Sequence, residues 1–196
     1  DLLDGEDLPH LGATVLLEDE PLRRFLDSGT EPAHLAEADR RAAAVGPDDW
    51  LDLMFTSGTT GHPKGVRSRH GASIRSFRYY ADNLGIRHGD RYLLVNPLFH
   101  TFGSKAGVVA AMTAGATLYP VPVFDPDAAA DLIAAEAITV FPGPPTIYHS
   151  LLQLPPEKRE RLRSLRLAVT GAAAVPVELL RRMREELGLE VVLTAY

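Results

Sequence analysis

Short apolar runs alternate along this sequence with amphipathic stretches, and this alternation limits the possible folds more than any other feature. Seven runs have the length and composition of strands, and several are too continuously apolar to leave one face in water. They are Ala13–Leu17, Leu51–Thr56, Arg91–Asn96, Ala116–Val121, Ile138–Phe141, Leu165–Thr170 and Leu189–Thr194. The pattern predicts an α/β fold: a distorted doubly wound, mostly parallel sheet flanked by helices.

Three of the intervening stretches have recognisable helix ends. Asp125 can cap a helix whose first position is Pro126. A second helix starts near Pro176 and stops at Gly188, and a third spans residues 71–84. The glycine loop described below should lie at the carboxyl end of a strand, where open α/β sheets place their ligands.

Two polar segments are interpreted as structural. Residues 31–47 are polar and rich in alanine, which is typical of a linker or a loosely packed excursion. The arginine-rich stretch from Lys158 to Arg166 could be an anion site, but glutamates are interleaved with it. That mixture favours a solvated helix face.

The composition excludes several classes of protein. A net charge of −6 argues against a general nucleic-acid binder. The absence of cysteine excludes disulfides, thiolate metal sites and a cysteine nucleophile, and it is consistent with a cytoplasmic protein. No apolar run approaches the ~20 residues that span a bilayer, so we expect no integral membrane segment.

A glycine-rich loop, Thr56-Ser-Gly-Thr-Thr-Gly-His-Pro-Lys-Gly65, follows the predicted strand that begins at Leu51. Glycines let backbone N–H groups converge on an anion, the four hydroxyl side chains add donors, and the lysine adds a mobile positive charge. Lys64 is one of only three lysines in a chain with 17 arginines, which suggests a chemical role. An ordinary turn is the alternative, but the coincidence of all three features favours a phosphate site.

Two other loop types are excluded by spacing. A Walker loop has glycine before the lysine and Ser or Thr after it, whereas Pro63 and Gly65 flank Lys64. A hydrolase nucleophile elbow requires Gly-x-Ser-x-Gly, and position 55 is phenylalanine.

The loop from Thr56 to Gly65 resembles the signature loop of the adenylate-forming superfamily, which includes acyl-CoA synthetases, luciferases and peptide-synthetase adenylation domains. Further segments match that superfamily in order and spacing from about Asp49 onward, and the most similar branch is the fatty-acyl or related acyl-CoA ligases. The matching segments are Asn96-Pro-Leu-Phe-His-Thr-Phe-Gly103, Ala114-Gly-Ala-Thr117, Pro142-Gly-Pro-Pro-Thr146, Val169-Thr-Gly-Ala-Ala-Ala174 and Thr194-Ala-Tyr196.

The resemblance implies an acid–CoA ligase that uses ATP, Mg²⁺ and CoA. Lys64 and His100 would be catalytic, with Lys64 at the phosphates and His100 near the substrate carboxylate. The nucleotide would contact Thr56, Ser57, Gly58, Thr59, Thr60, Gly61, Lys64, Gly171, Ala172, Ala173, Thr194 and Tyr196. Structural alternatives remain open for three of these positions: His100 as a core histidine, residues 171–173 as a tight turn, and Tyr196 as a core aromatic.

Residues 99–111 favour a particular class of acid. The peptide-synthetase branch places an aspartate in this region to bind an amino group, whereas this stretch contains no acidic residue. Apart from Ser104 and Lys105, its central residues are small and apolar. We therefore expect a fatty, alicyclic or aromatic acid.

The same resemblance indicates that residues 1–196 are an internal fragment of an N-terminal ATP- and acyl-binding domain, with a lead-in at 1–48 and the motif-bearing core at 49–196. The glutamate that helps to hold Mg²⁺, the ribose-binding acidic residue and the C-terminal domain would lie beyond Tyr196. We expect no metal ligands in this chain, no adenylation by the chain alone, and self-association through exposed apolar surface. A carrier-protein-loading ligase and a non-catalytic nucleotide-binding module are the alternative functions.

Overall fold

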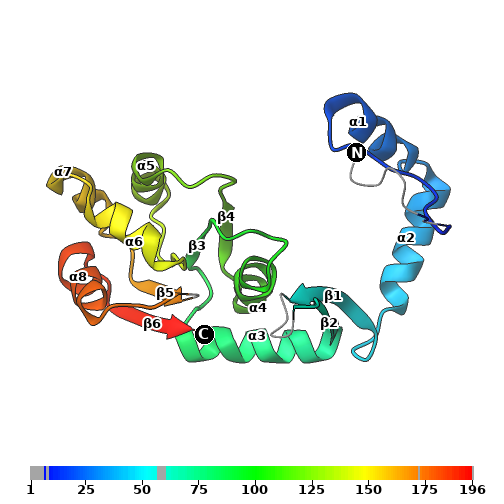
Figure 1. Cartoon of the computed structure of the whole chain (residues 1–196). Helices are drawn as coiled ribbons and strands as arrows, with labels where there is room; N and C mark the ends of the chain where they lie inside the picture. The colour runs from blue at the N-terminus through cyan, green and yellow to red at the C-terminus, as the bar shows by residue number, and fades with distance from the viewer. Residues whose placement is uncertain (1–6, 8, 57–60, 172, 196) are drawn as a thin grey trace. The chain divides into compact units, whose positions relative to one another are not determined.

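The computed structural model describes residues 7, 9–56, 61–171 and 173–195 (Figure 1). The chain divides into two compact units, Asp1–Gly46 and Pro47–Tyr196. Predicted site residues Ser57, Gly58, Thr59, Thr60, Ala172 and Tyr196 lie outside the described residues. Among the described residues, no helix is long and apolar enough to cross a membrane.

The described part of the first unit contains two helices, α1 (Asp19–Ser28) and α2 (Pro32–Ala44). The predicted strand at 13–17 is wrong: these residues have no strand partner, and Leu17 is 84% exposed. Most of the segment 31–47 is α2, and no residue of this helix is buried, which agrees with the predicted loosely packed excursion rather than with an irregular linker. Pro32 starts this helix, its alanines have high helix propensity, and Glu37 pairs with Arg41 one turn later.

Within the residues that the structure describes, the second unit contains six strands. They are β1 (Trp50–Thr56), β2 (Lys64–Arg69), β3 (Arg91–Leu94), β4 (Thr117–Pro120), β5 (Leu167–Gly171) and β6 (Val191–Ala195). Its helices are α3 (His70–Leu84), α4 (Ala110–Ala114), α5 (Pro126–Glu136), α6 (Pro145–Leu152), α7 (Pro156–Arg159) and α8 (Val177–Leu187). A π-helix, η1 (Phe102–Val109), precedes α4, and a 3₁₀ turn, η2 (Glu160–Leu162), follows α7.

The parallel strands lie in the order β4, β3, Val140, β5, β6. Strand β3 pairs with β4 and β5 pairs with β6, while single bridges join Val140 to Tyr92 of β3 and to Leu167 of β5. The predicted strand 138–141 is therefore reduced to one bridge residue. Counted from β3, this is the order 2-1-3-4-5 of a doubly wound sheet, whose switch point lies between β3 and Val140.

Two apolar clusters cover the two faces of this sheet. Leu93 belongs to a cluster with Tyr148 and Met183 of α6 and α8, whereas its neighbours Tyr92 and Leu94 belong to a cluster with Ala81 of α3. Successive residues of a strand point to opposite faces, so helices pack against both faces (Figure 1). The predicted doubly wound α/β fold is confirmed.

Strand β1 does not belong to this sheet. It pairs with β2 in an antiparallel hairpin, with Thr56 opposite Lys64 at the end that carries the glycine loop. The loop does follow the carboxyl end of a strand, as predicted, but that strand is separate from the parallel sheet. The hairpin leads directly into α3, which begins at His70.

The predicted helix boundaries agree closely with α3, α5 and α8. Helix α3 ends at Gly85, whose φ of 73° lies in the left-handed region that glycine tolerates. The Asp125 side chain accepts a hydrogen bond from the backbone N–H of Ala128, 2.8 Å away, as expected for the cap of α5. In the arginine-rich stretch, Lys158 and Arg161 form exposed ion pairs, which supports the solvated-face interpretation.

Asp90 connects the start of β3 with the start of β5 and with Thr139, which precedes the bridge residue Val140. Its carboxylate is 3% exposed and accepts hydrogen bonds from Thr139 Oγ1 at 2.8 Å, from the Arg87 N–H at 2.8 Å and from Arg166 Nε at 3.1 Å. Burial alone would raise the pKa of Asp90, but the hydrogen bonds from Arg166, Arg87 and Thr139 outweigh it and hold the pKa below its ordinary value of 3.8.

This network predicts an acid-dependent loss of stability. Because the pKa of Asp90 is lower in the folded state than in the unfolded state, its ionisation stabilises the folded protein at pH values above the unfolded-state pKa of about 4. This stabilisation is lost as the pH falls through the folded-state pKa. Asp90→Asn should lower the free energy of unfolding by about 2 kcal/mol at pH 7 and flatten its decline in acid. Thermal unfolding between pH 7 and pH 2 measures both effects. Asp127→Asn, which breaks an exposed pair, is the control, and an equal loss in both variants would contradict the prediction.

Candidate functional site

A pocket of about 360 Å³ lies at the carboxyl ends of the parallel strands. Its lining comes from segments far apart in the sequence: Phe77 and Tyr80 of α3, His100, Phe102 at the start of η1, and Gly171 and Ala195 at the ends of β5 and β6. Open α/β sheets bind ligands at this edge. The structure therefore brings the predicted site residues His100 and Gly171 into one pocket.

The segment after β3 positions His100. Asn96 is buried, and its side-chain Nδ2 donates to the carbonyl oxygen of Pro142, 3.1 Å away, across the switch point of the sheet. His100 Nδ1 accepts a hydrogen bond from the backbone N–H of Phe102 at 3.1 Å. In the neutral ring the proton is therefore assigned to Nε2, which can donate to a carboxylate. The side chain is exposed, so the core-histidine interpretation is wrong.

Gly171 allows two strands to approach closely. A Cβ atom at this position would lie 1.8 Å from the carbonyl oxygen of Ala195, far inside any real contact distance. Glycine here therefore keeps β5 and β6 paired at the pocket wall. Ala173 and Thr194 are exposed, and neither lines this pocket.

The aromatic residues of α3 give the pocket much of its apolar surface. Phe77 and Tyr80 are in edge-on contact, with ring centroids 6.0 Å apart. Burial raises the pKa of Tyr80 to about 12, so its hydroxyl stays protonated at neutral pH. Neither residue was singled out from the sequence, because a helix that bears aromatic residues is more often part of the core.

A second pocket, of about 550 Å³, lies beside the hairpin. Thr56 and Ser68 of the hairpin contribute to its lining, together with Lys105 of η1. Phe77 and Thr101 border both pockets, so the two adjoin. Of the predicted loop residues, Thr56 reaches this region, whereas Gly61 and Lys64 are exposed and line neither pocket.

Lys105 is the polar residue that the sequence interpretation missed. It is buried, and its Nζ contacts Asp52 at 3.0 Å and Ser68 Oγ at 2.7 Å. A lysine inside a stretch of small apolar residues was the signal that could have indicated a buried ion pair. Within the described residues, no group of three or more His, Cys, Asp or Glu side chains could hold a metal ion.

Comparisons with known proteins agree with this geometry. The family model for AMP-binding enzymes matches residues 2–196. The chain belongs to the AMP-binding enzyme family. A 3-[(3aS,4S,7aS)-7a-methyl-1,5-dioxo-octahydro-1H-inden-4-yl]propanoyl:CoA ligase of Mycobacterium tuberculosis is 54% identical over 99% of this chain and 39% of its own length. The ligase of the same name from Rhodococcus jostii is 51% identical over 82% of this chain and 31% of its own length.

This chain also has the fold of a solved domain from an adenylate-forming enzyme. The inhibitor-bound N-terminal domain of FACL13 from Mycobacterium tuberculosis has a TM-score of 0.70 and 29% identity, covering 90% of this chain and 48% of that domain. The chain thus spans well under half the length of the two ligases, and about half of the solved domain. The resemblance to adenylate-forming enzymes is confirmed.

Proposed function

We propose that the full-length protein is a ligase that activates a carboxylic acid with ATP and transfers the acyl group to CoA. The observation that carries this proposal is the shared pocket of His100 and Gly171, two predicted site residues from distant segments, at the ligand-binding edge of the sheet. CoA is proposed as the acceptor, rather than a carrier protein, because both similar ligases are CoA ligases.

In the proposed first step, a carboxylate oxygen of the acid attacks the α-phosphorus of ATP. The bond from that phosphorus to the oxygen bridging the β-phosphate breaks, and pyrophosphate leaves with the electron pair. In the second step, the CoA thiolate attacks the acyl carbon and AMP leaves. Both steps depend mainly on positioning and on neutralising charge, which backbone donors and Lys64 can supply.

Three parts of the chain would hold these reactants. The loop from Thr56 to Lys64 would bind the β- and γ-phosphates, and residues 171–173 would flank the adenine together with Thr194 and Tyr196. His100 would donate from Nε2 to the substrate carboxylate. ATP in such enzymes carries Mg²⁺, and the described residues contain no cluster of three or more acidic or histidine side chains that could hold it.

We also propose an alicyclic acid with keto groups as the substrate class. The two similar ligases are named for a dioxo-octahydroindenyl propanoyl group, a compact bicyclic acid. The candidate acyl pocket has apolar walls formed by Phe77, Phe102 and Ala106, and its volume of about 360 Å³ suits a bicyclic body better than a long extended chain.

His100→Ala in the full-length enzyme is expected to lower kcat/KM for the acid roughly 10- to 100-fold, because a hydrogen bond to a charged group contributes about 1.5–3 kcal/mol. The KM for ATP should change little. Release of AMP in the presence of acid, ATP and CoA measures both parameters. His149→Ala, at an exposed position on α6, is the matched control. An unchanged kcat/KM in His100→Ala would remove this residue from the site.

A further inference from the structure

Lys105 connects two elements that carry different parts of the proposed site. Its side chain is 7% exposed, and its Nζ lies 3.0 Å from Asp52 Oδ2 of β1 and 2.7 Å from Ser68 Oγ of β2. Asp52 and Ser68 are directly opposite each other in the hairpin. A single ammonium group therefore contacts both strands of the hairpin that leads into the glycine loop.

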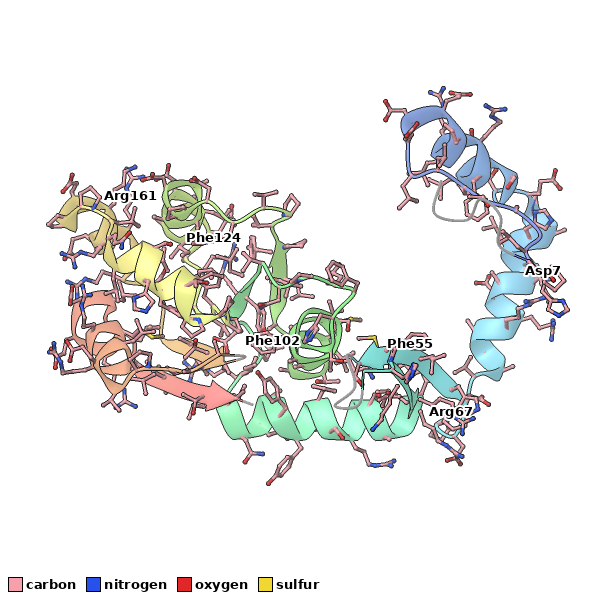
Figure 2. All side chains as sticks on the ribbon, viewed as in Figure 1. Asp7, Phe55, Arg67, Phe102, Phe124 and Arg161 are labelled. Carbon is pink, nitrogen blue, oxygen red and sulfur yellow. The ribbon has the colours of Figure 1, made fainter. Side chains whose placement is uncertain are left out.

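Within the part of the chain that the structure describes, the large apolar side chains of the hairpin are largely exposed. Leu53 is 53% exposed, Phe55 is 70% exposed and Val66 is 49% exposed, so burial of these side chains contributes little. Figure 2 labels Phe55 on β1 and Phe102 at the start of η1. The contact at Lys105 therefore supplies a directional polar connection between the hairpin and η1.

Helix η1 is itself held rigidly. A Cβ atom at Gly103 would lie 2.2 Å from the carbonyl oxygen of Pro97, and one at Gly107 would lie 2.6 Å from Leu94 Cδ1, so the helix packs closely against β3 and the segment after it. The first residue of η1, Phe102, donates its N–H to His100 Nδ1. π-Helical turns are rare and are often found at functional sites. Lys105 thus extends from a fixed support next to His100.

We propose that Lys105 is a positioning residue that sets the phosphate-binding loop at the correct distance from His100. This inference rests on the proposed function, which assigns the glycine loop of the hairpin to the phosphates of ATP and His100, next to η1, to the carboxylate of the acid. In-line attack requires the reacting atoms to be about 3–3.5 Å apart, and a displacement of 1 Å can cost roughly 100-fold in rate. A salt bridge that aligns the two binding elements would meet this requirement.

Two variants of the full-length enzyme separate positioning from stability. Lys105→Met leaves Asp52 as an uncompensated, partly buried charge and should lower the thermal unfolding midpoint. Asp52→Leu/Lys105→Met removes both charges and should restore the midpoint. Both variants should nevertheless show at least a tenfold lower kcat and a raised KM for ATP in acid-dependent ATP–pyrophosphate exchange, with little change in the KM for the acid. Lys158→Met is the matched control, because that lysine forms an exposed pair.

Amide hydrogen exchange gives a readout that does not depend on activity. Residues 53–55 and 65–67 should exchange faster in both variants than in the unmodified enzyme, because the hairpin is no longer held to η1. A double variant with unchanged kcat, KM for ATP and hairpin exchange would overturn the proposal. So would an altered preference among acids with unchanged ATP kinetics, since Lys105 would then act as a pocket residue. If the unmodified enzyme shows no ATP–pyrophosphate exchange, the proposed function fails. In that case amide hydrogen exchange still tests the role of Lys105: unchanged exchange of the hairpin amides in both variants would show that Lys105 does not hold the hairpin to η1.

Discussion

Gly171→Val is expected to destabilise the full-length protein by about 3 kcal/mol or more, the largest stability effect among these variants. Even the first atom of the new side chain would lie 1.8 Å from the carbonyl oxygen of Ala195. Relieving this steric clash requires β6 to move away from β5, and this movement would also distort the wall of the pocket that contains His100. Chemical unfolding followed by far-UV circular dichroism measures the loss.

Gly12 offers the control for this substitution. A Cβ atom at Gly12 meets nothing within 4 Å, so Gly12→Val should change the free energy of unfolding by less than about 0.5 kcal/mol. If Gly171→Val were as stable as this control, the close pairing of β5 and β6 at Ala195 would be wrong.

Lys64→Ala is expected to have the largest effect on activity, a fall of roughly 100-fold or more in kcat for acid-dependent pyrophosphate exchange. Removing one preorganised group that stabilises developing charge typically costs this much. Lys64 is exposed at the end of the hairpin and pairs with Thr56 across the loop, so its loss should not disturb packing. The thermal unfolding midpoint should therefore stay within a few degrees of that of the unmodified enzyme.

The chain contains a matched control for this experiment. Lys158 is paired with Asp127 at the surface, and exposed pairs of this kind contribute about 0–1 kcal/mol. Lys158→Ala should leave both stability and exchange unchanged. Comparable exchange rates in Lys64→Ala and Lys158→Ala would show that the loop lysine does not act on the phosphates.

Local signals in the sequence were sufficient for much of the fold. Helices α3, α5 and α8 were predicted because their ends depend on residues inside the same segment, such as the Asp125 cap and the glycine after α3. Strand β5 was predicted because all its residues are buried, and residues 92–94 of β3 are buried as well, so both segments are continuously apolar. Both kinds of signal belong to a single element and need no knowledge of its partners.

Features that depend on pairing were not predictable in the same way. An apolar run such as 13–17 becomes a strand only when another strand lies beside it, and in the structure none does. The partner of β1 was missed because β2, Lys64–Arg69, is polar and lacks the pattern of a buried strand. Residues 138–141 have the right composition, yet only Val140 forms bridges to its neighbours.

In the candidate site too, some residues were predictable from local sequence signals, whereas others depend on how distant segments pack. His100 was predicted from its motif, and its meeting with Gly171 follows from the rule that carboxyl ends of parallel strands share one edge. The contributions of Phe77 and Tyr80 depend on how α3 packs, which no local pattern reveals. The contact between Lys105 and Asp52 spans 53 residues and depends on where the hairpin lies.

Acid-dependent ATP–pyrophosphate exchange by the full-length protein tests the proposed adenylation most directly. A panel should contain bicyclic keto acids, their counterparts without keto groups, long-chain fatty acids and amino acids. We expect exchange with alicyclic keto acids, weaker exchange with fatty acids and none with amino acids. Absence of exchange with every acid, by a folded protein that binds ATP, would contradict adenylation and would favour a nucleotide-binding role for the same loop.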